Sequence, residues 1–185
     1  LRNRYFTIRH GESEANIAHI LLSHPKEGTV SFGLSEKGKQ QVIDSVSKSK
    51  KNKHLDSSVI IYSSDFLRAR QTAEISKRIL GSRKKILYHK KLRERYFGAF
   101  DKTTLRNIEI VWKHDQKNPH HAYRGVESPS RVLKRLLALI YLLDRKYKNQ
   151  TILLVSHGDP LQILHTHFSQ KPLVQQRKTK HLETA

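Results

Sequence analysis

Short apolar runs alternate along the chain with longer segments in which apolar positions recur at helical spacing. The apolar runs predict strands that are buried on both faces, at 4–8, 59–62, 85–89 and 151–155. The amphipathic segments predict helices over 14–22, 36–50, 66–80, 103–112 and 131–147, and from Asp159 onward. Strands that alternate with helices are typical of three-layer α/β/α sandwiches with a mainly parallel central sheet.

Turn and capping residues set the expected ends of these elements. Ser35 is a predicted N-cap, Gly81 a predicted helix end, and Pro160 suits the first turn of a helix. Three polar segments are predicted loops: 25–34, 113–126 and 171–180. Residues 181–185 could begin one more strand. Neither a repeat nor a long linker interrupts the chain, so we expect one domain over residues 1–185.

Composition excludes several classes of chemistry. With 185 residues, 36% hydrophobic and 28% charged, the chain has the make-up of a globular domain. The absence of cysteine rules out disulfides, thiolate nucleophiles and cysteine-bound zinc. Methionine is also absent, even at the first position, so we expect the sequence to be trimmed. The apolar stretch 136–143 is too short to span a bilayer and no signal core follows the start, which favours a cytoplasmic protein.

The charge is strongly basic, with 36 Lys and Arg against 16 Asp and Glu and a net charge of +20. Such a surface attracts phosphorylated substrates, nucleic acid or another polyanion, although a solvated surface without a partner is the plain alternative. Lys48 to Lys53 could bind nucleic acid, but no aromatic residue interleaves the cluster to stack on bases. Several histidines lack acidic neighbours at ligand spacing, so we expect no metal at His114, His120, His121, His165 or His167.

Polar side chains follow each predicted strand. Arg9 and His10 come after the first strand, Arg68 after the second, Glu94 after the third and His157 after the fourth. Because the carboxyl ends of parallel strands meet at one edge of a sheet, these side chains should converge.

The residue types fit phosphoryl transfer. Guanidinium groups bind phosphate oxygens through several donors, and a neutral imidazole is a competent nucleophile toward phosphorus. A carboxylic acid can protonate the leaving oxygen and later activate water. Glu94 is the least secure member, because Arg93 and Arg95 could hold it in a surface ion pair. Asp65 fits a helix N-cap better than a catalyst.

Six segments, in order, resemble the motifs of the histidine phosphatase superfamily, whose fold is called phosphoglycerate mutase-like. The quoted segments are Arg9-His10-Gly11-Glu12-Ser13 with Asn16, the run 33–40, the run 63–73, Leu92-Arg93-Glu94 with Phe97-Gly98, Gly125-Val126-Glu127-Ser128, and Ser156-His157-Gly158. The resemblance covers nearly the whole chain. It implies that the fold is the phosphoglycerate mutase-like sandwich and that neither a metal nor a cofactor is needed.

The resemblance also implies roles at matching positions. His10 would be the phosphorylated nucleophile and Glu94 the proton donor, while Arg9, Arg68 and His157 would surround the phosphate. Asn16 would be an accessory phosphate contact. The dipeptide Tyr123-Arg124 stands before the Gly-x-Glu-Ser element much as in fructose-2,6-bisphosphatase-like members, and we expect it to contact substrate.

The activity within the superfamily is a choice between a phosphatase, a mutase and a binding module. Phosphoglycerate mutases carry a Trp after the first motif and an adjacent Arg pair later, and this chain has neither in those regions. A phosphatase acting on a small phosphorylated metabolite or a phosphoprotein is therefore favoured. A catalytically weak module that binds polyanions is the third possibility, which the complete set of site residues disfavours.

Specificity should come from the irregular segments 13–33 and 96–126. We expect them to form a basic lid that suits an anionic substrate, with side chains from Lys26, Tyr96, Lys102, Lys113, His114, His120, His121, Tyr123 and Arg124. The oligomeric state does not follow from the sequence.

Overall fold

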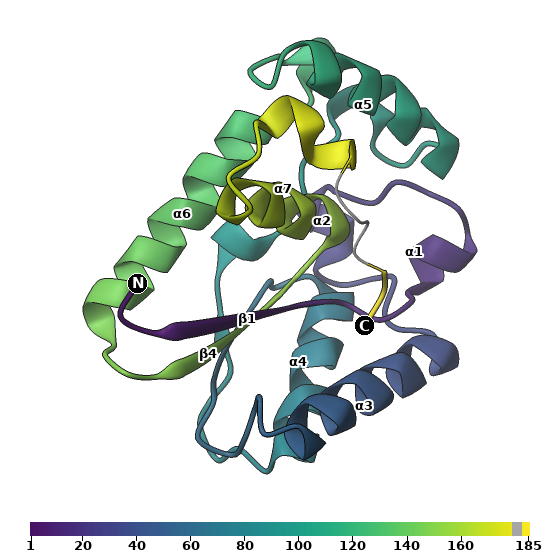
Figure 1. The fold of residues 1–185 in the computed structure, drawn as a ribbon. Coiled ribbons are helices and arrows are strands. Elements are labelled where there is room, and N and C mark those ends of the chain that lie inside the picture. Colours follow the sequence, from purple (N-terminus) through teal and green to yellow (C-terminus); the bar gives the residue numbers. More distant parts are fainter. Residues whose placement is uncertain (179–182) are drawn as a thin grey trace.

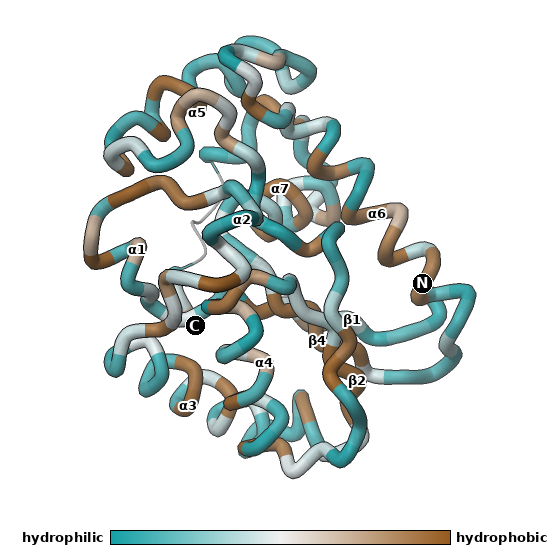
Figure 2. Tube along the Cα trace, turned by 180° about the vertical axis from the view of Figure 1, so that it is seen from behind, coloured by the Kyte–Doolittle hydropathy of each residue, from teal (hydrophilic) through white to brown (hydrophobic). Residues whose placement is uncertain are grey.

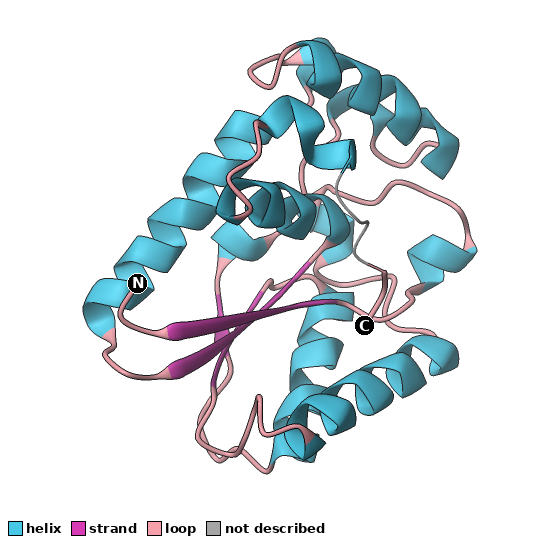
Figure 3. Ribbon diagram, in the orientation of Figure 1, coloured by secondary structure: helices cyan, strands magenta, loops and turns pink. Residues whose placement is uncertain are grey.

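In the computed structural model, which describes residues 1–178 and 183–185, four parallel strands form one sheet between two helical layers (Figures 1 and 3). The strands are β1 (Arg4–Arg9), β2 (Ile60–Ser63), β3 (Leu87–Tyr88) and β4 (Thr151–Ser156), and they lie in the order β1-β4-β2-β3. The three-layer α/β/α sandwich expected from the sequence pattern is confirmed.

Each face of the sheet has its own apolar core. The helices α3 (Glu36–Lys51) and α4 (Leu67–Leu80) cover one face, where they pack on Ile61 and Leu153. The helices α6 (Pro129–Lys146) and α7 (Gly158–Phe168) cover the other face, over Ile60 and Ile152. Burial on both faces explains why the strands are continuous apolar runs rather than alternating ones, and the apolar strands lie in the middle of the molecule in Figure 2.

Helix ends largely follow the expected chemistry. Ser35 Oγ accepts a hydrogen bond from Gly38 N at the start of α3, and Gly81 ends α4 with a φ of 73°. The predicted helix 14–22 is wrong beyond its first turn, since α1 ends at Ile17 (Glu14–Ile17). The following residues instead bind the backbone of a distant segment, with Leu21 N donating to Thr103 O and Leu105 N to His19 O.

All three predicted loops contain helical turns. The helix expected over 103–112 begins as a 3₁₀ turn (Leu105–Asn107) and continues as α5 (Ile108–Lys117), so the loop expected from 113 starts later. A one-turn helix, α2 (Pro25–Gly28), lies in the segment 25–34. Further 3₁₀ turns are Lys90–Leu92, Gly98–Phe100, Tyr123–Gly125 and Leu173–Lys178.

The strand suggested for residues 181–185 is not observed where it can be tested. Residues 183–185 have no regular structure, and 181–182 lie outside the described residues. Within the described part of the chain, no helix combines the length and the apolar character needed to cross a membrane.

Residues 15–22 and 97–112 together form a cap over the carboxyl edge of the sheet. An isolated bridge between Ile20 and Thr104 joins the two segments. A third apolar cluster supports them, with Leu21, Phe97 and Val111 buried in it. In Figure 1, α1 and α5 lie on the right-hand side of the molecule, above α3 and α4.

Candidate active site

The adjacent strands β1 and β4 carry two histidines to one point. Arg9 pairs with Ser156 at the carboxyl ends of these strands, and His10 N donates to Ser156 O at 3.0 Å. The next residue after β4 is His157, and its ring lies edge-on to that of His10 with the centroids 5.1 Å apart. The pairing of two neighbouring strands therefore brings together residues that are far apart in the sequence.

His10 is held as a neutral imidazole in one tautomer. Its Nδ1 lies 2.7 Å from Gly11 O, and a carbonyl only accepts, so Nδ1 carries the proton. Its Nε2 accepts a hydrogen bond from Arg68 Nε at 3.0 Å. Burial, together with the positive charges of Arg68 and Arg9, holds the pKa of His10 well below its ordinary value. The side chain thus presents an unprotonated Nε2 at neutral pH.

Two glycines permit the close packing around this histidine. A Cβ on Gly11 would lie 2.2 Å from Gly38 O, so only glycine lets the loop after β1 approach the first turn of α3. A Cβ on Gly158 would lie 3.2 Å from Arg9 Cζ, so glycine leaves room for the guanidinium against the start of α7.

Arg68 is buried with part of its hydrogen-bonding capacity unused. It is 3% exposed, and its Nη2 donates to Leu22 O at 3.1 Å. Its Nη1 is buried and has no hydrogen-bond partner among the described residues. Burial lowers the pKa of Arg68 to about 10, which still leaves it charged at neutral pH. A buried donor without a partner is costly, and an anion would satisfy it.

His157 has a similar arrangement. Its Nε2 lies 2.9 Å from Ser64 Oγ, whereas its Nδ1 is buried without a partner in the described residues. Burial, followed by the charges of Arg68 and the neighbouring His10, holds its pKa well below the ordinary value. It is therefore a neutral ring that has one nitrogen left for a ligand.

Glu94 stands in the cavity wall and not in a surface ion pair. Arg93 binds Asp65 through two hydrogen bonds of 2.7 and 2.6 Å, while Arg95 turns inward. That use of Asp65 also means that it is not the N-cap of α4, a position taken by Phe66. Burial raises the pKa of Glu94 to about 7 and the Asp159 carboxylate adds to the rise, against the opposing effect of Arg68. Glu94 can therefore hold or release a proton near neutral pH.

Beneath the cap lies a cavity of about 690 Å³. Arg9, His10, Arg68 and Glu94 line one end of it, and Asn16 lies on the wall nearby. His157 does not line it; its ring is buried beside that of His10. The Asn16 Oδ1 accepts from Ser13 N at 3.0 Å, so this residue also closes the capping box of α1.

The structure does not bring Tyr123 and Arg124 to this cavity wall. Tyr123 stacks on His114 with the ring centroids 3.9 Å apart, and the Arg124 guanidinium lies 5.8 Å from the Phe100 ring centroid. Nor do the other side chains of the expected basic lid line it; the wall residues of the cap come instead from 15–22 and 97–112.

The sequence analysis missed a buried group of charged residues beside the cavity, which we call the ion cluster: Arg95, Asp115, His121, Asp159 and Arg177. Arg95 Nη1 and Nη2 each donate to Asp115 at 2.7 Å, and Nη1 also reaches Asp159 at 3.2 Å. Asp159 pairs with Arg177 at 2.6 Å, and Asp115 with His121 at 2.6 Å. No motif links these positions, and each comes from a different segment.

The ion cluster touches the site through Glu94. Arg95 N donates to Glu94 Oε1 at 2.8 Å, and Asp159 lies on the wall of the same cavity. Although burial acts in the other direction, Arg177 and Arg95 hold the pKa of Asp159 below its ordinary value, so it is ionised. Among the described residues, no group of three or more His, Cys, Asp or Glu side chains is placed to hold a metal ion.

Comparison with known proteins assigns the family. Residues 5–185 match the histidine phosphatase superfamily (branch 1). The chain belongs to this superfamily. A relative in Arabidopsis thaliana, "Phosphoglycerate mutase-like protein 4", is 26% identical over 174 residues, which cover 85% of this chain and 67% of the relative.

Several solved structures align with this chain over nearly its whole length. A phosphoserine phosphatase mutant from Entamoeba histolytica, in complex with phosphoserine, aligns with a TM-score of 0.78 at 22% identity, over 98% of this chain and 87% of its own. YhfR from Bacillus stearothermophilus aligns with a TM-score of 0.78 at 24% identity, over 98% and 87%. A mycobacterial glucosyl-3-phosphoglycerate phosphatase has a TM-score of 0.76 at 20% identity, over 97% and 85%. At these identities the similarity establishes the shared fold.

Proposed function

We propose that this superfamily member is a phosphomonoester hydrolase that works through a phosphohistidine at His10. The observation that carries the proposal is the tautomer of His10, in which Gly11 O holds the Nδ1 proton and leaves the Nε2 lone pair in a cavity beside Glu94. A neutral imidazole with a fixed lone pair is a nucleophile that needs no base to activate it.

In the first step, His10 Nε2 attacks phosphorus and the bond from phosphorus to the ester oxygen breaks. Glu94, whose raised pKa of about 7 keeps a large fraction of it protonated near neutral pH, gives its proton to the departing alkoxide. Arg68 Nε, which otherwise binds Nε2, turns to the phosphoryl oxygens together with Arg9. In the tautomer in which Ser64 Oγ donates to His157 Nε2, the Nδ1 proton of His157 is a further donor. These donors stabilise the charge that spreads over the equatorial oxygens.

In the second step, water attacks the phosphohistidine and the nitrogen–phosphorus bond breaks. The Glu94 carboxylate takes one proton from this water, so phosphate leaves and both side chains return to their starting forms. The Asn16 amide is an accessory donor to the phosphoryl group at the edge of the cavity.

The test is to trap the intermediate. The enzyme is mixed with a generic aryl phosphate, quenched in alkali, which preserves phosphohistidine, and digested for mass spectrometry. We expect a phosphoryl adduct on the peptide that contains His10, and a loss of turnover of about 10,000-fold or more in His10→Ala. His114→Ala, a histidine outside the cavity, is the matched control. Full activity of His10→Ala would refute the proposal.

Transfer to a second substrate oxygen, as in a mutase, is the competing activity, and the Arabidopsis relative carries a mutase-like name. The cap argues against it, because its charged wall residues Arg106 and Glu109 have opposite signs and do not form a site for a substrate carboxylate. Interconversion of phosphoglycerates faster than release of phosphate would favour the mutase.

A further inference from the structure

The part of the cavity beyond the phosphate end is mainly apolar. Its wall in the cap consists largely of aliphatic and aromatic side chains, namely Ile20, Leu21, Phe97, Leu105, Ile108 and Trp112. The polar residues of this wall are Asn16, His19, Thr104, Arg106 and Glu109. The basic residues that the sequence suggested for this wall do not line it, and the Lys102 ammonium binds Glu27 at 2.6 Å instead. The expected basic lid is therefore replaced by an apolar chamber.

The charged side chains on this wall do not favour an anion. Arg106 and Glu109 lie one turn apart and carry opposite charges, so their fields largely cancel. A second phosphate or a carboxylate placed here would lose water without gaining a dedicated cation.

Trp112 gives the chamber a fixed platform. The Arg177 guanidinium lies 4.0 Å from the centroid of its ring, and Asp159 holds that guanidinium in place at 2.6 Å. The Trp112 Nε1 atom is buried and has no hydrogen-bond partner among the described residues. It is a donor for a neutral oxygen and not a charge that would select an anion.

The size of the cavity exceeds what a phosphate group needs. About 690 Å³ is within the range of roughly 300–1,000 Å³ that is typical of small-molecule sites. The substrate must therefore have a body that fills the chamber beside Trp112.

We infer that the substrate is a phosphomonoester of a bulky, uncharged and largely apolar alcohol, and not a bisphosphate or a phosphorylated carboxylic acid. This inference rests on the proposed function for catalysis, but the binding preference belongs to the chamber and can be measured without turnover.

The kinetic test uses substrates whose leaving groups are all primary alkoxides, so that chemical reactivity is matched. We expect kcat/KM for phenylpropyl phosphate to exceed that for glycerol phosphate and for phosphoglycerate by about 50-fold or more, because the apolar body is buried and the carboxylate is rejected. A higher kcat/KM for phosphoglycerate would overturn the inference and leave the proposed function intact.

A pair of variants on one helix locates the preference. Ile108→Lys puts a cation on the chamber wall, and Ile110→Lys makes the same change at a position of α5 that is 40% exposed and away from the wall. Ile108→Lys should lower kcat/KM for phenylpropyl phosphate about tenfold and raise that for phosphoglycerate, whereas Ile110→Lys should change neither. Equal effects of the two variants would overturn the inference.

A binding measurement separates this inference from catalysis. Phenylbutyl phosphonate, which cannot be hydrolysed, should bind at least about tenfold more tightly than inorganic phosphate, and phosphonobutyrate should not. This result would stand even if no ester were hydrolysed, which would refute only the proposed function. If the phenyl group adds no affinity, the apolar chamber does not bind the substrate body.

Discussion

Two buried arginines, Arg68 and Arg95, show how differently this fold treats a charge inside the protein. Arg95 is fully buried and donates to two carboxylates, Asp115 and Asp159, as well as to a backbone carbonyl. Arg68 is almost as buried, yet it has no carboxylate in contact and one nitrogen without a partner among the described residues. One charge is balanced by the protein, and the other is left for a ligand.

The contrast has a physical meaning. A buried charge is tolerated when carboxylates and hydrogen bonds replace the lost water, as they do around Arg95. A buried donor that lacks a partner costs about 1–3 kcal/mol, and proteins retain such costs mainly at functional sites. If this division holds, substitutions in the active site and in the ion cluster should have opposite effects on stability.

The largest effect is expected at Glu94, where the active site holds an acid whose charged form is unfavourable. Glu94→Gln removes the proton donor and should lower kcat by about 100- to 10,000-fold. The same variant should be more stable than the wild type above neutral pH. Because folding raises the pKa of Glu94 from 4.5 to about 7, the wild type loses stability as the pH rises through this range. The glutamine variant avoids that loss.

Denaturant unfolding at pH 8 checks the second half of this prediction. The variant should be more stable than the wild type by up to about 3 kcal/mol at that pH and should show little difference below pH 4.5. If the variant is less stable than the wild type at pH 8, the Glu94 carboxylate is stabilised by its neighbours, as the carboxylates of the ion cluster are.

In the ion cluster, removal of a carboxylate should lower the stability of the protein. Asp115→Ala leaves Arg95 buried without its bidentate partner, so we expect a loss of about 3–5 kcal/mol in the free energy of unfolding. Asp44→Ala, an exposed carboxylate on α3, should change stability by less than about 0.5 kcal/mol. A small effect of Asp115→Ala would show that Arg95 does not depend on its carboxylates.

An anion should stabilise the active site and not the ion cluster. Inorganic phosphate at 100 times its dissociation constant should stabilise the wild type by about 2.7 kcal/mol, because it binds the folded state alone. In Arg68→Met this stabilisation should largely disappear, while the variant without phosphate should unfold no more easily than the wild type. Thermal unfolding with and without phosphate measures both; an undiminished response of Arg68→Met would remove Arg68 from the anion site.

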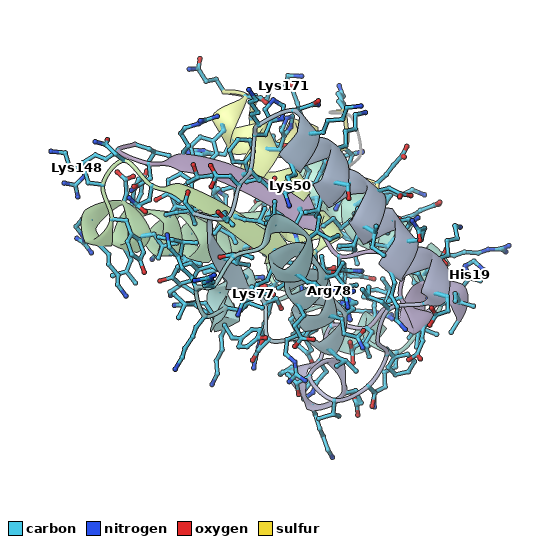
Figure 4. All side chains as sticks on the ribbon, turned by 90° about the horizontal axis from the view of Figure 1, so that it is seen from below. His19, Lys50, Lys77, Arg78, Lys148 and Lys171 are labelled. Atoms are coloured by element: carbon cyan, nitrogen blue, oxygen red, sulfur yellow. The ribbon has the colours of Figure 1, made fainter. Side chains whose placement is uncertain are left out.

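The basic residues of the surface belong to neither the active site nor the ion cluster. Lys50 extends from α3 and Lys77 from α4, and Lys148 and Lys171 lie after α6 and α7 (Figure 4). Positive charge is therefore spread over several elements and is not collected at the cavity, and it gives no guide to the substrate.

The sequence could predict the active site better than the ion cluster because the two are encoded differently. Arg9 ends β1, and His10 and His157 directly follow strands, so the carboxyl edge of the sheet brings them together. Arg95, Asp115 and Arg177 meet only through the packing of the 3₁₀ turn Leu173–Lys178 against α5, which no local pattern specifies. The same limit explains why the predicted basic lid is wrong: the sequence of a segment does not determine which of its side chains face the cavity.

The smallest predicted effect concerns Asp159, which belongs to both regions. It balances Arg95 and Arg177, and it also raises the pKa of Glu94 by its negative charge. Other groups face Glu94 from neighbouring elements: Arg9 from β1, Arg68 from α4, and Arg135 of α6, which donates to Glu94 O at 3.3 Å. All of these are cations, so Asp159 is the group among them that favours the protonated acid.

The pH dependence of kcat/KM distinguishes the two effects of Asp159, on Arg95 and on the pKa of Glu94. In the wild type, kcat/KM should fall as the pH rises above about 7, when Glu94 loses its proton. Asp159→Asn removes the neighbouring negative charge, lowers the pKa of Glu94 and moves this fall to lower pH. Asp115→Asn also removes a carboxylate from Arg95 but is not among the groups acting on Glu94, so its profile should keep the wild-type midpoint. If both variants shift the profile equally, Asp159 acts only by holding Arg95, and the boundary between the two regions lies at Glu94 itself.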